Sequence, residues 1–361
     1  MADLLPSFEQ ALRSALPPTW SITVERRPSF GGARPDALIT LTSPGGEEAR
    51  VLVECKGVVA PRDVALVDKQ LQRYADAAAR AGRRVEGAVL AAPFVSPTTR
   101  AHLDRLGTGW FDATGNLRLR LDGHAVFLDR VGADRGGQRD PADRLLKSLR
   151  GPAAAKVVLE LCEAALPIGV RDLADRAGVG AATSARVLEL LDREAVIDRE
   201  GHGSVTAVRR RALIERWTRD YRVMNSNDVV TALDPRGLNH ALGALSTAGA
   251  RVAVTGSAAA RAYLPDGVTP VSPLVSLSLY AEDPIGLMER LRLRKVDRGA
   301  NVIVMRPYDE VVHAKSRVVN GMTLAPPAQV VADLLTGPGR SSEEAEQLMS
   351  ALGADDRDWV S

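Results

Sequence analysis

The chain has 361 residues, of which 45% are hydrophobic and 25% are charged, and its formal net charge is +2. This length predicts two or three domains, and the apolar content is sufficient for buried cores. Because the charge is nearly balanced, the chain has no overall electrostatic attraction to nucleic acid, and DNA binding has to be argued from local motifs.

Composition also bears on the compartment. No apolar run reaches membrane-spanning length, and the first residues do not form a secretory signal. Cys55 and Cys162 are far apart in apolar contexts, which argues against a disulfide framework or a cysteine zinc site. We therefore expect a cytoplasmic protein without membrane contact.

The first expected domain covers residues 1–131. Apolar spacing predicts a helix at 4–16, and alternation predicts a strand at 21–25. A hairpin of two apolar strands follows, opened by Asp36 and closed by Glu54 and Lys56. The later elements alternate in the same way, which favours a mixed sheet with helices. They are a helix at 63–81, a strand at 85–92, a helix from Ser96 and a strand–turn–strand at 110–121.

The hairpin carries charged groups where a buried strand should have none. Strand alternation puts Glu54 and Lys56 on one face and Cys55 on the other, and the hairpin can bring Asp36 close to that face. One or two carboxylates together with substrate phosphates commonly hold Mg²⁺, and the lysine could orient water or offset phosphate charge. The alternative is a hairpin with a surface ion pair.

Three elements of this region resemble the PD-(D/E)XK nuclease superfamily. They are Pro35-Asp36, Glu54-x-Lys56, and Gln70-x-x-x-Tyr74, which is similar to the signature of the RecB-like branch. The resemblance implies a restriction-endonuclease-like α/β/α domain. In it Asp36 and Glu54 would bind Mg²⁺ or Mn²⁺, and Lys56 and Gln70 would belong to the catalytic set. Glu9 is a candidate upstream acid, and the turn from Asp112 to Asn116 either lines the cleft or is a plain hairpin turn.

The second expected domain covers residues 139–222, after a linker at 132–138. Helices are expected at 153–165, 170–177 and 181–194, with the turn Gly178-Val-Gly180 before the third, and a hairpin follows at 195–208. This order resembles a winged helix-turn-helix. The helix around Trp217 and Tyr221 is expected to pack as a hinge to the last domain.

In a winged helix the start of the third helix enters the major groove. We expect Ala182, Thr183, Ser184 and Arg186 to be exposed there, with Arg186 reaching a phosphate or a guanine edge. Further candidate DNA contacts are Arg199 and His202 in the wing and Arg209 and Arg210 after it. The alternatives are solvated surface charges and a winged helix used for dimerisation.

The last expected domain covers residues 223–361. Its strand, Gly256-Ser257 turn and helix are similar to the opening of nucleotidyltransferase folds. Those enzymes need an Asp-x-Asp pair on the next strand, where this chain reads Ser276-Leu-Ser278-Leu-Tyr280. Two hydroxyls cannot replace two metal-binding carboxylates, so we reject nucleotidyl transfer and expect Ser257 to be a helix cap.

Taken together, the layout resembles AbiEi-type antitoxin and transcriptional-regulator proteins with an N-terminal nuclease-like domain. The segments that carry this resemblance are Phe94–Pro97, Trp110–Asn116, the winged helix, Gly256–Ala260, Arg292–Pro307 and Ala332–Ala345. It implies a bacterial DNA-binding regulator with an α+β C-terminal domain similar to a degenerate nucleotidyltransferase. In some relatives such a protein is an autorepressor paired with a toxin.

Three functions stay open at this point. The favoured one is a regulator that binds double-stranded DNA through its winged helix, as a homodimer. The second is an endonuclease dependent on Mg²⁺ or Mn²⁺ that acts through Asp36, Glu54 and Lys56. The third is a scaffold whose last domain neutralises a toxin-like protein partner.

Overall fold

The computed structural model describes residues 4–121, 123, 126–132, 146, 148–200, 203–245, 249–354 and 356–359. The chain forms two compact units. The N-terminal unit contains residues 1–144 and 193–195, and the C-terminal unit contains residues 145–192 and 196–361. No helix in the described residues is long and apolar enough to cross a membrane.

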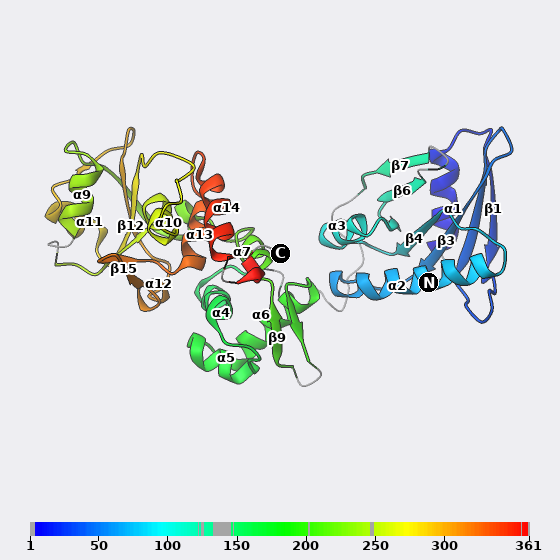
Figure 1. Cartoon of the computed structure of the whole chain (residues 1–361), viewed down its shortest axis with the longest axis horizontal. Helices are drawn as coiled ribbons and strands as arrows, with labels where there is room; N and C mark the ends of the chain where they lie inside the picture. Colours follow the sequence, from blue (N-terminus) through cyan, green and yellow to red (C-terminus); the bar gives the residue numbers. More distant parts are fainter. Residues whose placement is uncertain are drawn as a thin grey trace. The chain divides into compact units, whose positions relative to one another are not determined.

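The N-terminal unit alternates helices and strands (Figure 1). Its elements are α1 (Leu4–Ala15), β1 (Ser21–Arg26), β2 (Ala37–Thr42), β3 (Glu48–Cys55), η1 (Pro61–Asp63), α2 (Val64–Arg80), β4 (Gly87–Ala92), α3 (Pro97–Arg105), β5 (Gly109–Asp112), β6 (Leu117–Leu121) and β7 (Val126–Arg130).

The seven strands form one mixed sheet in sequence order, β1 to β7. Strands β3, β4 and β5 are parallel, and the other neighbours are antiparallel. Because side chains alternate along β3, Val51 and Val53 pack with α1, whereas Leu52 packs with α2 and α3. Helices therefore cover both faces of the sheet.

The C-terminal unit begins with three helices. Its elements are α4 (Pro152–Glu163), α5 (Val170–Ala177), α6 (Ala181–Arg193), β8 (Ile197–Arg199), β9 (Val205–Val208), α7 (Arg210–Trp217), α8 (Val223–Ser226), β10 (Asp228–Leu233), α9 (Leu238–Leu245), β11 (Val252–Thr255), α10 (Gly256–Tyr263), β12 (Leu277–Ala281), α11 (Pro284–Arg290), β13 (Arg294–Lys295), β14 (Val302–Arg306), α12 (Val311–Ala314), β15 (Arg317–Val319), β16 (Met322–Leu324), α13 (Pro327–Leu335), α14 (Ser341–Leu352) and η4 (Arg357–Trp359).

A second mixed sheet of seven strands has the order β13-β10-β14-β12-β11-β16-β15. Helix α7 packs against both α4 and α13, and α10, α13 and α14 pack on one another. One continuous apolar core therefore runs through the unit, from Leu149 to Trp359. The stacked rings of Trp217 and Tyr221, with centroids 4.7 Å apart, lie in this core.

At this level the expected architecture is confirmed: the chain is a mixed α/β protein of more than one domain, with two large mixed sheets among its described residues. The boundaries at 131, 139 and 222 and the finer fold assignments stay predictions.

Candidate functional site

Asp36 lies at the start of β2, beside the end of β3. The pairing of Ala37 with Val53 continues to a position where Asp36 faces Glu54. The Asp36 carboxylate accepts a hydrogen bond from the backbone N–H of Cys55 at 2.8 Å. The hairpin thus brings Asp36 to the end of the strand that carries Glu54, as the sequence predicts.

Glu54, Lys56 and Gln70 form a closed network of hydrogen bonds. One Glu54 oxygen, Oε1, accepts from Lys56 Nζ and from Gln70 Nε2, each at 2.9 Å. Lys56 Nζ also donates to Gln70 Oε1 at 3.2 Å, and Gln70 Nε2 donates to the Tyr74 hydroxyl at 2.6 Å. Glu54 is 7% exposed, so its negative charge is stabilised mainly by the Lys56 and Gln70 donors. The structure brings the predicted set together, and its catalytic role stays a prediction.

The Cys55 thiol lies close to the charged groups at the end of β3. Its side chain packs with the apolar cluster on the α1 face. Burial, together with the neighbouring carboxylates of Asp36 and Glu54, raises the pKa of the Cys55 thiol to about 11. Both carboxylates therefore lie close enough to Cys55 to act on the same thiol.

The donor set for a divalent ion consists of two carboxylates. Glu9 does not extend it, because this residue pairs with Arg13 at 2.8 Å on α1, the helix that packs on the other face of the sheet. The described residues contain no group of three or more His, Cys, Asp or Glu side chains placed to hold a metal. Asp36 and Glu54 nevertheless fit Mg²⁺, which commonly uses one or two carboxylates and takes its other ligands from water and phosphate.

The turn between β5 and β6 is a structural element. Asp112 and Asn116 are fully buried. Asp112 accepts hydrogen bonds from Val95 N, Thr114 N and Asn116 Nδ2. Of the two alternatives for this segment, the structure favours the plain hairpin turn.

Helices α4, α5 and α6 and the hairpin β8–β9 follow the order expected for a winged helix. Gly178 ends α5 with φ of +62°, a left-handed conformation that favours glycine and allows the sharp turn into α6. Ile168, before α5, forms an additional bridge to Val205 of β9, so the wing is joined to the helical part.

The start of α6 differs from the expectation at one residue. Arg186 is exposed, and among the residues that the structure describes it bonds only its own helix, through the Ala182 carbonyl and the Thr183 hydroxyl. Thr183 is half-buried. Ser184 is fully buried, with no hydrogen-bond partner for its hydroxyl among the described residues. The expectation that Ser184 is exposed is therefore wrong, because this residue shares the buried stripe of Val187, Leu188 and Leu191.

Two of the candidate DNA contacts in and after the β8–β9 hairpin, Arg199 and Arg209, form hydrogen bonds within that hairpin. Arg199 Nε donates to the Gly203 carbonyl at 3.0 Å, and Arg209 Nη2 donates to both carboxylate oxygens of Asp198 at 3.0 Å. His202 lies outside the described residues.

Arg210 points toward the end of the chain. Its guanidinium pairs with Asp356 at 2.5 Å and Asp358 at 3.0 Å, and it donates to the Cys162 carbonyl at 2.8 Å. Only 12% of its side chain is exposed. We therefore withdraw Arg210 from the predicted phosphate contacts, because its charge is already neutralised inside the unit.

The residues around the Gly256-Ser257 turn contact residues that are distant in the sequence. Ser257 donates to Glu344 of α14 at 2.5 Å, so the expectation that Ser257 is a helix cap is wrong; Thr255 occupies the cap position. Gly256 has φ of +62°, and a Cβ there would lie 3.3 Å from the Ser278 hydroxyl. Thr255 in turn donates to Asp333 of α13 at 2.5 Å.

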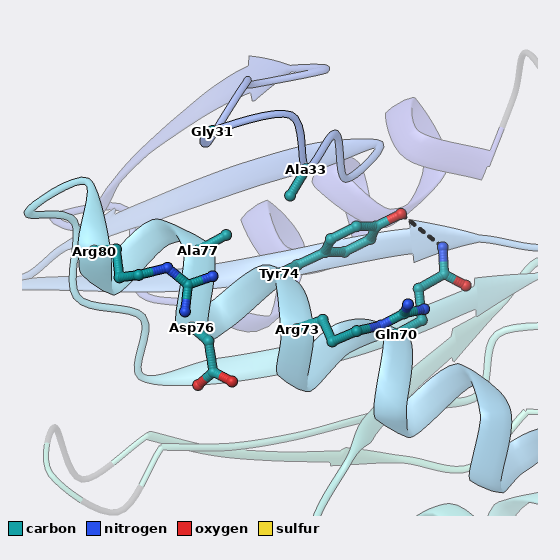
Figure 2. A pocket seen from close by; sticks show the side chains of 8 residues that line it. All are labelled: Gly31, Ala33, Gln70, Arg73, Tyr74, Asp76, Ala77 and Arg80. Atoms are coloured by element: carbon teal, nitrogen blue, oxygen red, sulfur yellow. Dashed lines mark hydrogen bonds between the residues drawn. The ribbon is translucent and has the colours of Figure 1, made fainter.

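Sequence reasoning missed a groove beside the Glu54 network. A hollow of about 570 Å³ lies between α2 and the loop that contains Gly31 and Ala33 (Figure 2). Its helical side includes Arg73 and Arg80, which share the face of α2 that carries Gln70. The available signal was the helical spacing of these basic residues around Gln70 and Tyr74.

Comparison with known proteins gives one family. Residues 206–352 match the family described as "Transcriptional regulator, AbiEi antitoxin, Type IV TA system". The match begins in β9 and ends in α14, so the resemblance to AbiEi-type regulators is confirmed over this segment. No curated protein matches the chain, and no solved structure matches it either.

Proposed function

We propose that the protein is a transcriptional regulator of the AbiEi antitoxin type that binds double-stranded DNA through α6 and the β8–β9 wing. The observation that carries the proposal is the family match over residues 206–352, which runs from β9, the second strand of the hairpin, to the end of α14. The order of α4, α5, α6 and the wing supports duplex binding, since this arrangement presents a helix to the major groove.

Arg186 is the residue on which we place base or phosphate recognition. It is exposed on the second turn of α6, and the small side chains of Ala181 and Ala182 permit close approach to the groove. An arginine in this position is suited to a bidentate contact with guanine. Because Arg209 is paired and Arg210 is enclosed, fewer charges serve the phosphates than the sequence alone suggests.

A mobility-shift titration with DNA upstream of the protein's own operon tests this proposal. We expect specific binding to exceed binding to random DNA by roughly a thousandfold. Arg186→Ala should weaken it by about tenfold to a hundredfold, which corresponds to about 1–3 kcal/mol. Arg294→Ala, at an exposed arginine of β13, is the control and should bind normally. Equal affinity for operon DNA and random DNA at moderate salt would contradict the proposal.

The family description also supports a protein partner of the toxin type. The order of helices and hairpin supports a homodimer on DNA, because dimeric helix-turn-helix proteins bind two half-sites. Co-purification with the product of the neighbouring gene tests the first, and light scattering of the free protein tests the second. Absence of a stable complex with the neighbour would argue against the antitoxin role while leaving DNA binding to its own assay.

A second candidate function is hydrolysis of DNA by the N-terminal unit. The network of Glu54, Lys56 and Gln70 with Asp36 beside it favours this candidate. Asp36 and Glu54 would hold Mg²⁺ or Mn²⁺, which when bound supplies a hydroxide nucleophile and stabilises the leaving oxygen. The Lys56 Nζ would offset phosphate charge. Gln70, which bonds both Lys56 and Glu54, would hold these two side chains in position.

Cleavage of supercoiled, linear and single-stranded DNA with each metal tests this candidate. Glu54→Ala and Lys56→Ala should each remove cutting. Glu48→Ala is a matched control, because Glu48 lies on the same strand at its exposed far end. Residual cutting that is equal in wild type, Glu54→Ala and Lys56→Ala would show that the activity comes from elsewhere.

A further inference from the structure

The groove along α2 has a built shape. Its floor is the helix face from Gln70 to Arg80, and the loop with Gly31 and Ala33 lies opposite (Figure 2). The loop is closed on itself by two backbone hydrogen bonds between Phe30 and Ala33, at 2.9 and 3.0 Å. Gln70 belongs both to this groove and to the Glu54 network, so the groove leads to that network.

The charge of the groove is available for a ligand. Arg73 and Arg80 are exposed and lie about two helical turns, or roughly 10 Å, apart along α2. Neither makes an ion pair with any residue that the structure describes, although Asp76 also lines the hollow, so the two arginines leave the groove with a net positive charge. Two unpaired guanidinium groups on one helix face suit a ligand with repeated negative charges.

The groove also contains an aromatic ring. Tyr74 is half-buried and lines the hollow, and Figure 2 shows its ring between Ala33 and Gln70. The hydrogen bond from Gln70 to the Tyr74 hydroxyl at 2.6 Å holds the ring in place. A fixed aromatic ring beside two arginines is the combination with which proteins bind single-stranded nucleic acid.

We propose that this groove binds a single strand of DNA, with Arg73 and Arg80 on its phosphates and Tyr74 stacked on a base. A duplex keeps its base faces stacked on one another, so only an unpaired strand can offer a base to Tyr74. The inference rests on the hydrolytic candidate, since it names the nucleic acid that Glu54 and Lys56 would receive.

Fluorescence anisotropy of the full chain tests the groove, with a labelled single strand of about 15 nucleotides and EDTA to prevent hydrolysis. All variants carry Arg186→Ala, which reduces the contribution of the winged helix. Arg73→Ala with Arg80→Ala should weaken binding at least tenfold and lower the slope of log affinity against log salt by about 1.4. Arg105→Ala with Arg130→Ala removes the same charge from other exposed positions of the unit and should change little.

Tyr74 gives an independent measurement. Tyr74→Phe keeps the ring for stacking and loses only the hydrogen bond from Gln70, so it should lose much less affinity for the single strand than Tyr74→Ala, which should lose about tenfold. The inference would be overturned if the Arg73/Arg80 pair and the Arg105/Arg130 pair lost equal affinity for the single strand. Tighter binding of the matched duplex than of the single strand would overturn it as well. Normal binding in EDTA without any cleavage in Mg²⁺ would instead overturn the hydrolytic candidate alone.

Discussion

Asp333 is a carboxylate inside an apolar core, and four hydrogen bonds hold it there. Its Oδ1 accepts from Tyr221 and Gln329, each at 2.7 Å, and its Oδ2 accepts from Tyr280 at 2.9 Å and Thr255 at 2.5 Å. No cation pairs with it among the described residues, and it is 3% exposed. Burial therefore raises the pKa of Asp333 to about 6, against the opposing effect of its four donors.

This shift predicts a pH dependence of stability. The folded protein binds the Asp333 proton more tightly than the unfolded chain, so the contribution is complete below about pH 4 and is lost as pH rises through 6. The loss amounts to about 3 kcal/mol. Denaturant titrations of wild type and Asp333→Asn at pH 4 and 7 measure it. The stability advantage of wild type should shrink by that amount on going to pH 7, and a constant difference would contradict the shift.

The burial of Ser184 on α6 can be tested by substitution. Its buried hydroxyl has no partner among the described residues, and a buried unsatisfied group costs about 1–3 kcal/mol. Ser184→Ala should therefore leave the free energy of unfolding unchanged or raise it. It should also leave duplex affinity unchanged in a mobility shift, whereas a serine that touched DNA would lose affinity on the same substitution.

At the scale of elements, α7 packs against both α4 and α13, so it connects the helices at the start of the C-terminal unit to those at its end within one core. Arg210, its first residue, bridges the Cys162 carbonyl of α4 to Asp356 and Asp358 at the end of the chain. Arg209, one residue earlier, pairs with Asp198 at the surface of the wing. Neighbouring arginines thus have opposite environments.

This contrast provides a matched pair of variants. Arg210→Ala leaves two acids and a buried carbonyl without their donor, and we expect a loss of about 1–3 kcal/mol in unfolding free energy. Arg209→Ala removes an exposed pair and should cost less than about 1 kcal/mol. Thermal denaturation of both variants, with Arg210→Lys as a partial rescue, measures the difference. Similar losses at the two positions would show that Arg210 is not the bridge.

The same elements show how far sequence reasoning reaches. Strand alternation was enough to place Glu54 with Lys56, and helical spacing was enough to place Gln70 beside Tyr74, because these relations are local. The helix-turn-helix pattern predicts an exposed Ser184, although the spacing of this residue from Val187 and Leu188 indicates the buried stripe. The acidic partners of Arg210 lie more than 140 residues away. Such long-range pairings follow from the packed core, and no local pattern encodes them.

For the whole molecule, the distribution of apolar residues matters most. In the N-terminal unit they form two clusters, one on each side of the sheet. In the C-terminal unit a single cluster runs from Leu149, just before α4, to Trp359 in η4. Each unit thus contains the burial that a domain needs to fold on its own, and the chain should unfold as two cooperative bodies.

Scanning calorimetry of the full chain should therefore resolve two transitions. Leu12 on α1 and Leu348 on α14 are both fully buried, one in each unit. Replacing either by alanine removes buried apolar contacts and costs about 2–5 kcal/mol. Leu12→Ala should lower only the transition of the N-terminal unit, and Leu348→Ala only that of the C-terminal unit. If both substitutions lowered one common transition by similar amounts, the two cores would be thermodynamically coupled, and the expectation of two independently folding bodies would be wrong.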